Sequence, residues 1–194
     1  MKHKHSRHAI WRGTAAACRL TFGVALITLL GACASSRGPD GPPVNPPAGV
    51  ASTPNAVPRI EPIRVGGPNK PYSYSGRTYR PLTDDEPLEQ RGLGTWYGKA
   101  YHGRPTASGE IYDMYAMTAA HPTMPIPSYA RVRNPATGRS VIVRVNDRGP
   151  FERGTVIDLS YAAAAKLGIL RGATPVEVER LTFDMIRSGN WKAD

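Results

Sequence analysis

The sequence carries, at residues 141–150, the run Val-Ile-Val-Arg-Val-Asn-Asp-Arg-Gly-Pro. Its valines alternate as in a β-strand with one buried face, and Gly149 and Pro150 predict that the strand ends in a turn. Successive side chains of a strand point to opposite faces, so Asp147 can face a groove while the valines fix the backbone. We therefore take Asp147 as the first candidate catalytic residue. The alternative is a carboxylate that pairs with Arg148 and only caps the turn.

Two further polar motifs precede this stretch. Glu110 ends the small polar turn Thr106-Ala107-Ser108-Gly109-Glu110, and His121 lies in Ala119-Ala120-His121-Pro122. Two carboxylates that are distant in sequence but meet in the fold are the minimum set for cleaving a glycosidic bond by general acid and base catalysis. Burial or a nearby like charge raises the pKa of one acid, so that it keeps its proton near neutral pH. His121 either tunes this pair or is a buried histidine that is satisfied within its turn.

The folded unit is predicted over residues 92–182, which is enough chain for one core. Strand-like alternation recurs between glycine, proline and asparagine turns, at residues 94–100, 115–118, 130–133, 141–146, 156–158 and 176–181. Six short strands in so few residues indicate an all-β fold, a closed barrel. One helix is expected from Tyr161 to Leu167, with Ser160 as its cap and Gly168 as its stop. Residues 183–194 are expected to form a loose tail or a second short helix.

The first 32 residues are typical of an export signal, with a basic start and a short apolar core at residues 20–30. The motif Leu30-Gly31-Ala32-Cys33 follows at once and resembles a bacterial lipobox. Cys33 would then be the lipidated first residue of the mature chain, and several acyl chains would anchor it to a membrane. The next residues, Ala34 and Ser35, favour the outer membrane, facing the periplasm. The alternative is a plain secretory signal that leaves Cys33 free.

Cysteine use and charge agree with an exported protein. Cys18, the only other cysteine, lies within the predicted signal, so no disulfide is expected in the mature chain. Removing the signal takes away five cations and no acid, which lowers the formal net charge from +10 to +5. The remaining arginines are scattered among acids, so a nucleic-acid partner is not expected. A mildly positive surface suits an anionic polymer or lipid headgroups.

Residues 33–91 are rich in proline: twelve of the 19 prolines lie between Ala34 and Gln90. Proline-rich chain stays extended, so we expect a disordered periplasmic tether that holds the barrel away from its anchor. One island interrupts it near residues 72–82, where Tyr72, Tyr74 and Tyr79 flank Ser75-Gly76. This pattern predicts a short β-hairpin.

The motifs together resemble one family closely. Residues 98–121 read GKAYHGRPTASGEIYDMYAMTAAH, with Thr95-Trp96-Tyr97 before them and the Asn146–Pro150 run after them. This pattern resembles rare lipoprotein A, from about Tyr72 to Leu181 and again at the lipobox. The resemblance implies a double-psi β-barrel, a lytic transglycosylase that cuts peptidoglycan glycan strands, and a partner protein at the cell envelope or division site. In one respect the chain departs from the pattern of many relatives: we expect no C-terminal glycan-binding module of the SPOR type, so recruitment to the septum is not expected from this chain.

The resemblance also assigns residues. Asp147 matches the family's catalytic aspartate, Glu110 its second essential carboxylate, and His121 a histidine that supports activity. We expect Asp147 to act as general acid and then base, with Glu110 either tuning the proton affinity of Asp147 or stabilising the positive charge that develops on the sugar. The 6-hydroxyl of N-acetylmuramic acid would attack its own anomeric carbon and leave a 1,6-anhydro end. Asp158, directly before the predicted helix, is instead expected to cap or pair structurally.

Saccharide contacts are expected from aromatic and polar neighbours of these acids, namely Tyr97, Tyr101, His102, Arg104, Thr106, Ser108, Asn146 and Arg148. No cofactor is expected, and no metal either, because the two histidines of the mature chain lack ligand spacing. The rival interpretation is an expansin-like envelope lipoprotein that binds glycan without cleaving it. The presence of both Glu110 and Asp147 favours catalysis, because a module that only binds glycan needs neither acid.

Overall fold

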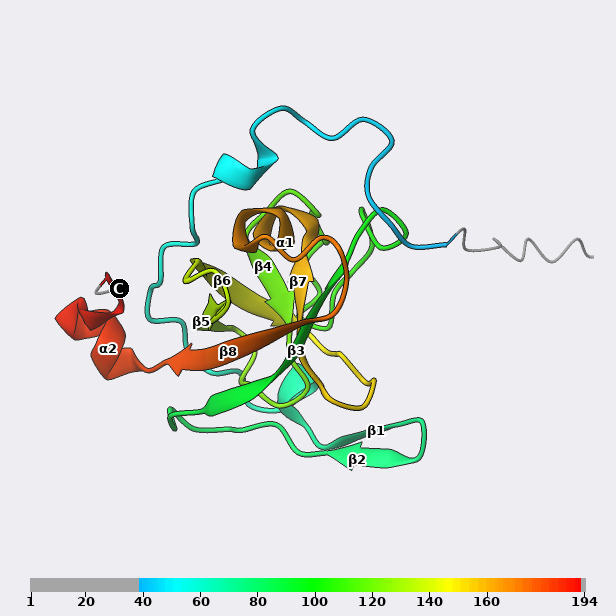
Figure 1. Ribbon diagram of the computed structural model, residues 1–194. Helices are drawn as coiled ribbons and strands as arrows, with labels where there is room; N and C mark the ends of the chain where they lie inside the picture. Colours follow the sequence, from blue (N-terminus) through cyan, green and yellow to red (C-terminus); the bar gives the residue numbers. More distant parts are fainter. Residues whose placement is uncertain (1–38, 193–194) are drawn as a thin grey trace, which may run out of the picture. The chain divides into compact units, whose positions relative to one another are not determined.

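The computed structural model describes residues 39–192, and these belong to one compact unit. Six strands close into a barrel in the order β3-β7-β4-β6-β5-β8 (Figure 1). The all-β, six-stranded double-psi barrel predicted from the sequence is therefore confirmed. Its strands are β3 (Glu89–Tyr97), β4 (Thr118–Ala120), β5 (Ser128–Arg133), β6 (Ser140–Asp147), β7 (Thr155–Ser160) and β8 (Thr174–Leu181).

The barrel mixes parallel and antiparallel pairs. β3 runs parallel to β7 and β4 runs parallel to β6, whereas the other four neighbouring pairs are antiparallel. Val141, Val143 and Val145 of β6 are fully buried in the main core cluster. By alternation, Arg144 and Asn146 point to the opposite side of the same strand. Side chains of β6 therefore point to two opposite faces, and the predicted site residues near β6 are divided between these faces.

Strand β4 differs from the sequence prediction. The strand expected at residues 115–118 begins only at Thr118, because Asp113–Ala116 form a turn closed by the Ala116 N–H and the Asp113 carbonyl. The register of β4 against β6 also shifts between Ala119 and Ala120. A bulge of this kind re-aims the side chains beyond it, and Ala120 lies directly beyond it.

The short helices follow their capping residues. In α1 (Tyr161–Leu167) the Ser160 hydroxyl accepts the Ala163 N–H, and Gly168 ends the helix in a left-handed conformation. The prediction for this helix is confirmed. A second helix, α2 (Phe183–Ser188), and the turn η3 (Asn190–Lys192) occupy the expected C-terminal tail.

The proline-rich segment is ordered from residue 39 onward, which corrects the expectation of a disordered tether over that part. The predicted hairpin is present as β1 (Tyr72–Tyr74) and β2 (Arg77–Tyr79), and two short 3-10 turns, η1 (Val50–Ser52) and η2 (Gly67–Asn69), precede it. The segment runs over the barrel surface (Figure 1) and is hydrogen-bonded to it, for example from the Ala56 N–H to the Ile142 carbonyl. Proline composition predicts extended chain but says nothing about such partners.

The predicted signal and Cys33 lie outside the described residues. Within residues 39–192, no helix has the length and apolar character needed to cross a membrane.

Candidate functional site

The register of four neighbouring strands brings Asp147 and Asp158 into one row. Ala120 of β4 pairs with Asp147 of β6 on one side and with Asp158 of β7 on the other. Asp158 in turn pairs with Thr95 of β3. Residues directly opposite one another across strands point to the same face. With strands about 4.8 Å apart, the two aspartate backbones are roughly 10 Å apart, separated by the small side chain of Ala120.

This row opens into a groove of about 730 Å³. Its walls are aromatic, and its polar lining is mainly acidic. The aromatic residues are Tyr74, Trp96, Tyr97, Tyr101 and Phe151, and the acids are Asp40, Asp147, Glu152 and Asp158. Aromatic faces beside a few convergent polar groups are what a saccharide chain needs from a binding surface.

The Asp147 carboxylate is aimed by two main-chain groups. Its Oδ1 accepts the N–H of Ala107 and the N–H of Arg148, each at 2.8 Å. Burial raises the pKa of Asp147 above its ordinary value, against the lowering effect of these two N–H groups and of the Arg148 charge. Gly149, directly after the turn, has φ +134°, a conformation that L side chains rarely adopt. The sequence motif therefore does present Asp147 at a groove.

Asp158 is the groove carboxylate that the sequence analysis left out. Asp158 was expected to cap the helix or to pair structurally; Ser160 is the cap, as predicted, and the Asp158 Oδ1 accepts the Thr95 hydroxyl, which is the pairing alternative. Burial, and then the charges of Glu152, Asp40 and Asp147, raise the pKa of Asp158 to about 6. The sequence does mark Asp158 as unusual, because it is an acid inside a strand-like apolar run. Its place beside Asp147 depends on which strands pair with β7, and the sequence does not show that pairing.

Glu110 lies on the other side of β6. Its carboxylate receives Arg144 Nη1 at 2.7 and 2.8 Å and Asn146 Nδ2 at 2.8 Å, and these two residues point away from the Val145 face. Burial raises the pKa of Glu110, but the Arg144 and Asn146 hydrogen bonds outweigh it and leave the pKa below its ordinary value. Glu110 is not among the residues that line the groove. The structure thus separates the two carboxylates that the sequence analysis paired, and the groove pairs Asp147 with Asp158.

His121 is a fully buried histidine with its ring positions occupied. Its Nδ1 accepts the N–H groups of Thr123 and Met124, and its Nε2 lies 3.0 Å from Gln90 Oε1. Burial, and then the Arg148 charge, lower the pKa of His121 to about 3, so the ring is neutral and Nε2 carries the proton. Its main chain touches the site directly, because the His121 N–H donates to the Asp147 carbonyl.

Arg148 and Asn146 are occupied by protein partners. The Arg148 guanidinium donates to the carbonyls of Pro68, His121 and Met124 and to Asn69 Oδ1, rather than to Asp147. Asn146 donates to Glu110, while its own carbonyl accepts the Ser108 N–H. Both residues, expected to bind substrate, hold neighbouring chain in place, although Arg148 also lines the groove and Asn146 Oδ1 is buried without a hydrogen-bond partner among the described residues.

The remaining predicted saccharide residues divide between groove and scaffold. Tyr97 and Tyr101 line the groove, and Tyr97 also stacks on Tyr112 with ring centroids 4.1 Å apart. Thr106 and Ser108 hydrogen-bond each other at 2.9 Å and shape the turn that carries Ala107. His102 accepts the Met114 N–H, and neither His102 nor Arg104 lines the groove. Thr106 and Ser108 therefore stabilise the loop that contacts Asp147, whereas His102 and Arg104 lie outside the groove.

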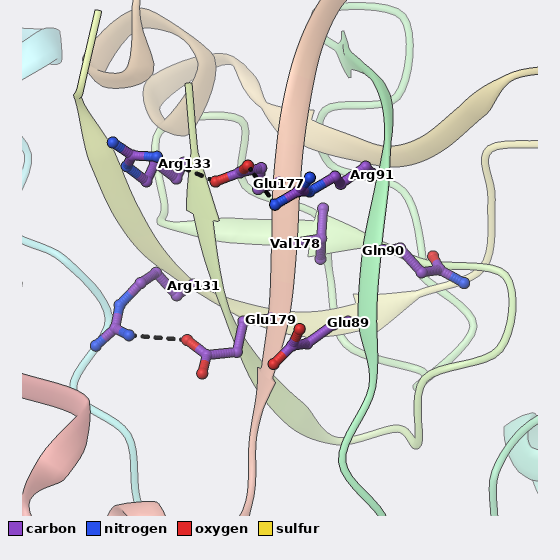
Figure 2. Close-up of a pocket in the computed structure, with 8 residues that line it drawn as sticks. All are labelled: Glu89, Gln90, Arg91, Arg131, Arg133, Glu177, Val178 and Glu179. Carbon is purple, nitrogen blue, oxygen red and sulfur yellow. Dashed lines mark hydrogen bonds and ion pairs between the residues drawn. The ribbon is translucent and has the colours of Figure 1, made fainter. Parts of the chain in front are cut away.

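A second hollow of about 450 Å³ lies across β3, β8 and β5 (Figure 2). Its charged side chains pair across neighbouring strands: Glu177 with Arg91 and Arg133, and Glu179 with Arg131. Such cross-strand pairs stabilise the sheet, so we place the candidate site at the Asp147 groove. Among residues 39–192, no group of three or more histidine, cysteine or acidic side chains is arranged to hold a metal ion.

The chain is similar to known proteins over most of its length. A domain family described as "Lytic transglycolase" matches residues 89–178. The chain is 44% identical over 171 residues to "Endolytic peptidoglycan transglycosylase RlpA" of Vibrio cholerae, covering 86% of this chain and 65% of the relative. Proteins of the same name from Pseudomonas aeruginosa and Neisseria meningitidis are 51% identical over 131 residues and 48% identical over 128 residues. These two matches cover 67% and 66% of this chain but only 38% and 53% of the relatives, so the chain spans about two thirds of its relatives' length or less.

Proposed function

We propose that this protein cleaves the glycan strands of peptidoglycan, a proposal supported by the match of residues 89–178 to the family described as "Lytic transglycolase". The bond cut would be the one between N-acetylmuramic acid and N-acetylglucosamine, within the strand, with a 1,6-anhydro end as product. The observation that carries this proposal is the row Asp147–Ala120–Asp158 at the floor of one aromatic groove. A surface that only binds glycan has no need of two partly buried acids facing one cleft.

The surroundings of the two aspartates divide the roles. The pKa of Asp158 is raised to about 6, so Asp158 is the better proton donor at neutral pH. Burial raises the pKa of Asp147 as well, but Asp147 has two main-chain N–H groups that stabilise its ionised form. This revises the expectation that Asp147 gives the first proton and assigns that step to Asp158.

The reaction follows from this division. Asp158 donates its proton to the bridging oxygen, the anomeric C–O bond breaks, and the departing sugar leaves as an alcohol. The Asp147 carboxylate stabilises the positive charge that develops on the remaining sugar and accepts the proton of its 6-hydroxyl. That oxygen closes on the anomeric carbon, and its intramolecular position gives it a large effective molarity over water.

Glu110 and His121 act on this site through the backbone. Glu110 ends the turn whose Ala107 N–H holds Asp147, and its ion pair with Arg144 ties that turn to β6. The His121 N–H holds the Asp147 carbonyl. Both residues would therefore support activity by fixing the direction of the Asp147 carboxylate.

The product of digestion tests the proposal. Purified full-length protein is incubated with intact sacculi and with peptide-free glycan, and the soluble fragments are analysed by mass. Anhydro ends are expected, and peptide-free strands should be cut faster. Fragments with reducing ends would show a hydrolase instead, and binding without fragments would establish the alternative, a glycan-binding envelope protein with an aromatic groove.

A leaving-group experiment separates the two acids. Asp158→Asn should lose cleavage of natural glycan but keep cleavage of a glycan bearing an aryl leaving group, which departs without protonation. Asp147→Asn should lose both. The opposite pattern would return the first proton to Asp147.

We further propose that the protein is anchored through a lipidated Cys33 to the outer membrane and faces the periplasm. The motif Leu30-Gly31-Ala32-Cys33 after an apolar run supports this location. Labelled palmitate should be incorporated into the parent protein but not into Cys33→Ser. Incorporation into both proteins, or into neither, would reject the anchor.

A further inference from the structure

Residues 61–69, here called the upstream clamp, lie before the residues that the family match covers and still contact three parts of the site. Glu61 receives Arg144 Nε and Nη2 at 2.8 and 2.9 Å, and Arg144 also binds Glu110. Arg64 Nη1 donates to the Ser108 carbonyl at 2.9 Å. Asn69 binds Arg148. The clamp thus reaches the Glu110 turn, strand β6 and the turn after Asp147.

Asn69 is the most completely integrated residue of the clamp. It is 2% exposed, and its amide fills all four of its hydrogen-bonding positions. Nδ2 donates to the carbonyls of Arg64 and Ile126 at 2.8 and 2.9 Å. Oδ1 accepts the Ile126 N–H at 2.9 Å and Arg148 Nη2 at 2.8 Å. A buried amide that is fully paired fixes the groups around it in one arrangement.

Arg148 links Asn69 to Asp147, because its guanidinium binds Asn69 and its main-chain N–H binds the Asp147 carboxylate. Besides Asn69, its guanidinium is bound by the Pro68 carbonyl and by the His121 and Met124 carbonyls. These bonds fix the side chain of the residue whose own N–H holds Asp147 Oδ1. Loss of the Asn69 amide would leave a buried cation with an unpaired N–H, which favours movement of the turn.

We propose that Asn69 is a positioning residue for Asp147: by holding the Arg148 guanidinium it fixes the turn that aims the Asp147 carboxylate into the groove. The expected effect on kcat rests on the proposed function, whereas the effect of Asn69 on the position of Asp147 does not. It extends the working site beyond the barrel to a segment that the family match leaves out.

The test compares three variants of the full-length protein, purified in detergent and assayed below their unfolding temperatures on peptide-free glycan. Asn69→Ala should lower kcat about tenfold or more and change KM less than about threefold, because it misdirects the carboxylate without touching substrate. Asn69→Asp keeps the acceptor for Arg148, but its second carboxylate oxygen would face the Arg64 and Ile126 carbonyls without a proton to donate, so its kcat should fall as well. Asn55→Ala is the matched control, since the Asn55 amide oxygen has no hydrogen-bond partner among the described residues.

A carboxyl NMR titration gives a second readout that needs no activity. The Arg148 charge lowers the pKa of Asp147, whereas burial raises it and Asp158 faces it from β7. Asn69→Ala should therefore raise the pKa of Asp147, and Asn55→Ala should not. An unchanged Asp147 pKa or an unchanged kcat in folded Asn69→Ala would overturn the inference. If the parent itself releases no fragments, the proposed function fails, and the titration alone decides the role of Asn69.

Discussion

Replacing Asp158 by asparagine should abolish cleavage and yet stabilise the fold at neutral pH. A pKa raised from 3.8 to about 6 means that keeping this carboxylate ionised costs the folded protein up to about 3 kcal/mol. Well below pH 3.8 the group is protonated in both the folded and unfolded states, so this cost is absent. Between about pH 3.8 and 6 the unfolded chain releases the proton while the folded protein keeps it, so stability falls across this window and levels off above about pH 6. Asparagine has no such cost and still offers an oxygen to Thr95.

Urea unfolding of parent and Asp158→Asn at pH 4 and pH 7.5 measures this difference. The variant should gain up to about 3 kcal/mol relative to the parent between the two pH values. Asp184→Asn is the control, because Asp184 is an exposed acid whose side chain is 89% accessible, and it should show no comparable gain. A variant that gains less than about 1 kcal/mol, or that becomes less stable as the pH rises, would refute the claim that Asp158 is held in an environment hostile to its charge.

Three other perturbations follow from the site contacts. Glu110→Gln should lower the free energy of unfolding at pH 7, because it removes the charge that pairs with Arg144. The difference from the parent should shrink as the pH falls through the lowered pKa of Glu110, since the parent then loses the same charge. A loss of stability that is independent of pH in urea unfolding would contradict the ion pair with Arg144. The His121 ring should remain a neutral Nε2–H tautomer from pH 5 to 8 in ¹⁵N NMR spectra, because its pKa is about 3, and a transition in that range would contradict its burial. Gly149→Ala should cost about 1–3 kcal/mol in thermal or urea unfolding and lower kcat, since alanine resists φ +134°, whereas Gly41→Ala should be neutral in both measurements.

Local sequence patterns were sufficient for the number of barrel strands, the caps of α1 and the position of Asp147, because each depends on alternation or on a residue within a few positions. They misplaced the bounds of β3 and β4, which run over Glu89–Tyr97 and Thr118–Ala120. Asp158 depends on something else. Its place beside Asp147 follows from the pairing of both residues with Ala120, and that pairing depends on the register shift between Ala119 and Ala120. A one-residue change of register moves a side chain to the other face, so the partner of Asp158 could not be predicted without the sheet.

The same distinction explains the upstream clamp. Twelve prolines in residues 34–90 indicate a chain that is extended before it binds anything, and such a chain loses little conformational entropy when it is laid along a surface. Extended chain is therefore as suitable for a clamp as for a tether, and what decides between them is whether buried partners exist. Glu61 binds Arg144 of β6, and Asn69 binds Arg148 directly after β6. These partners are 83 and 79 residues away in the sequence, so composition alone could not predict the contacts. It follows that a barrel expressed from residue 89 would keep both groove aspartates in its sequence and still lack the contacts that direct one of them.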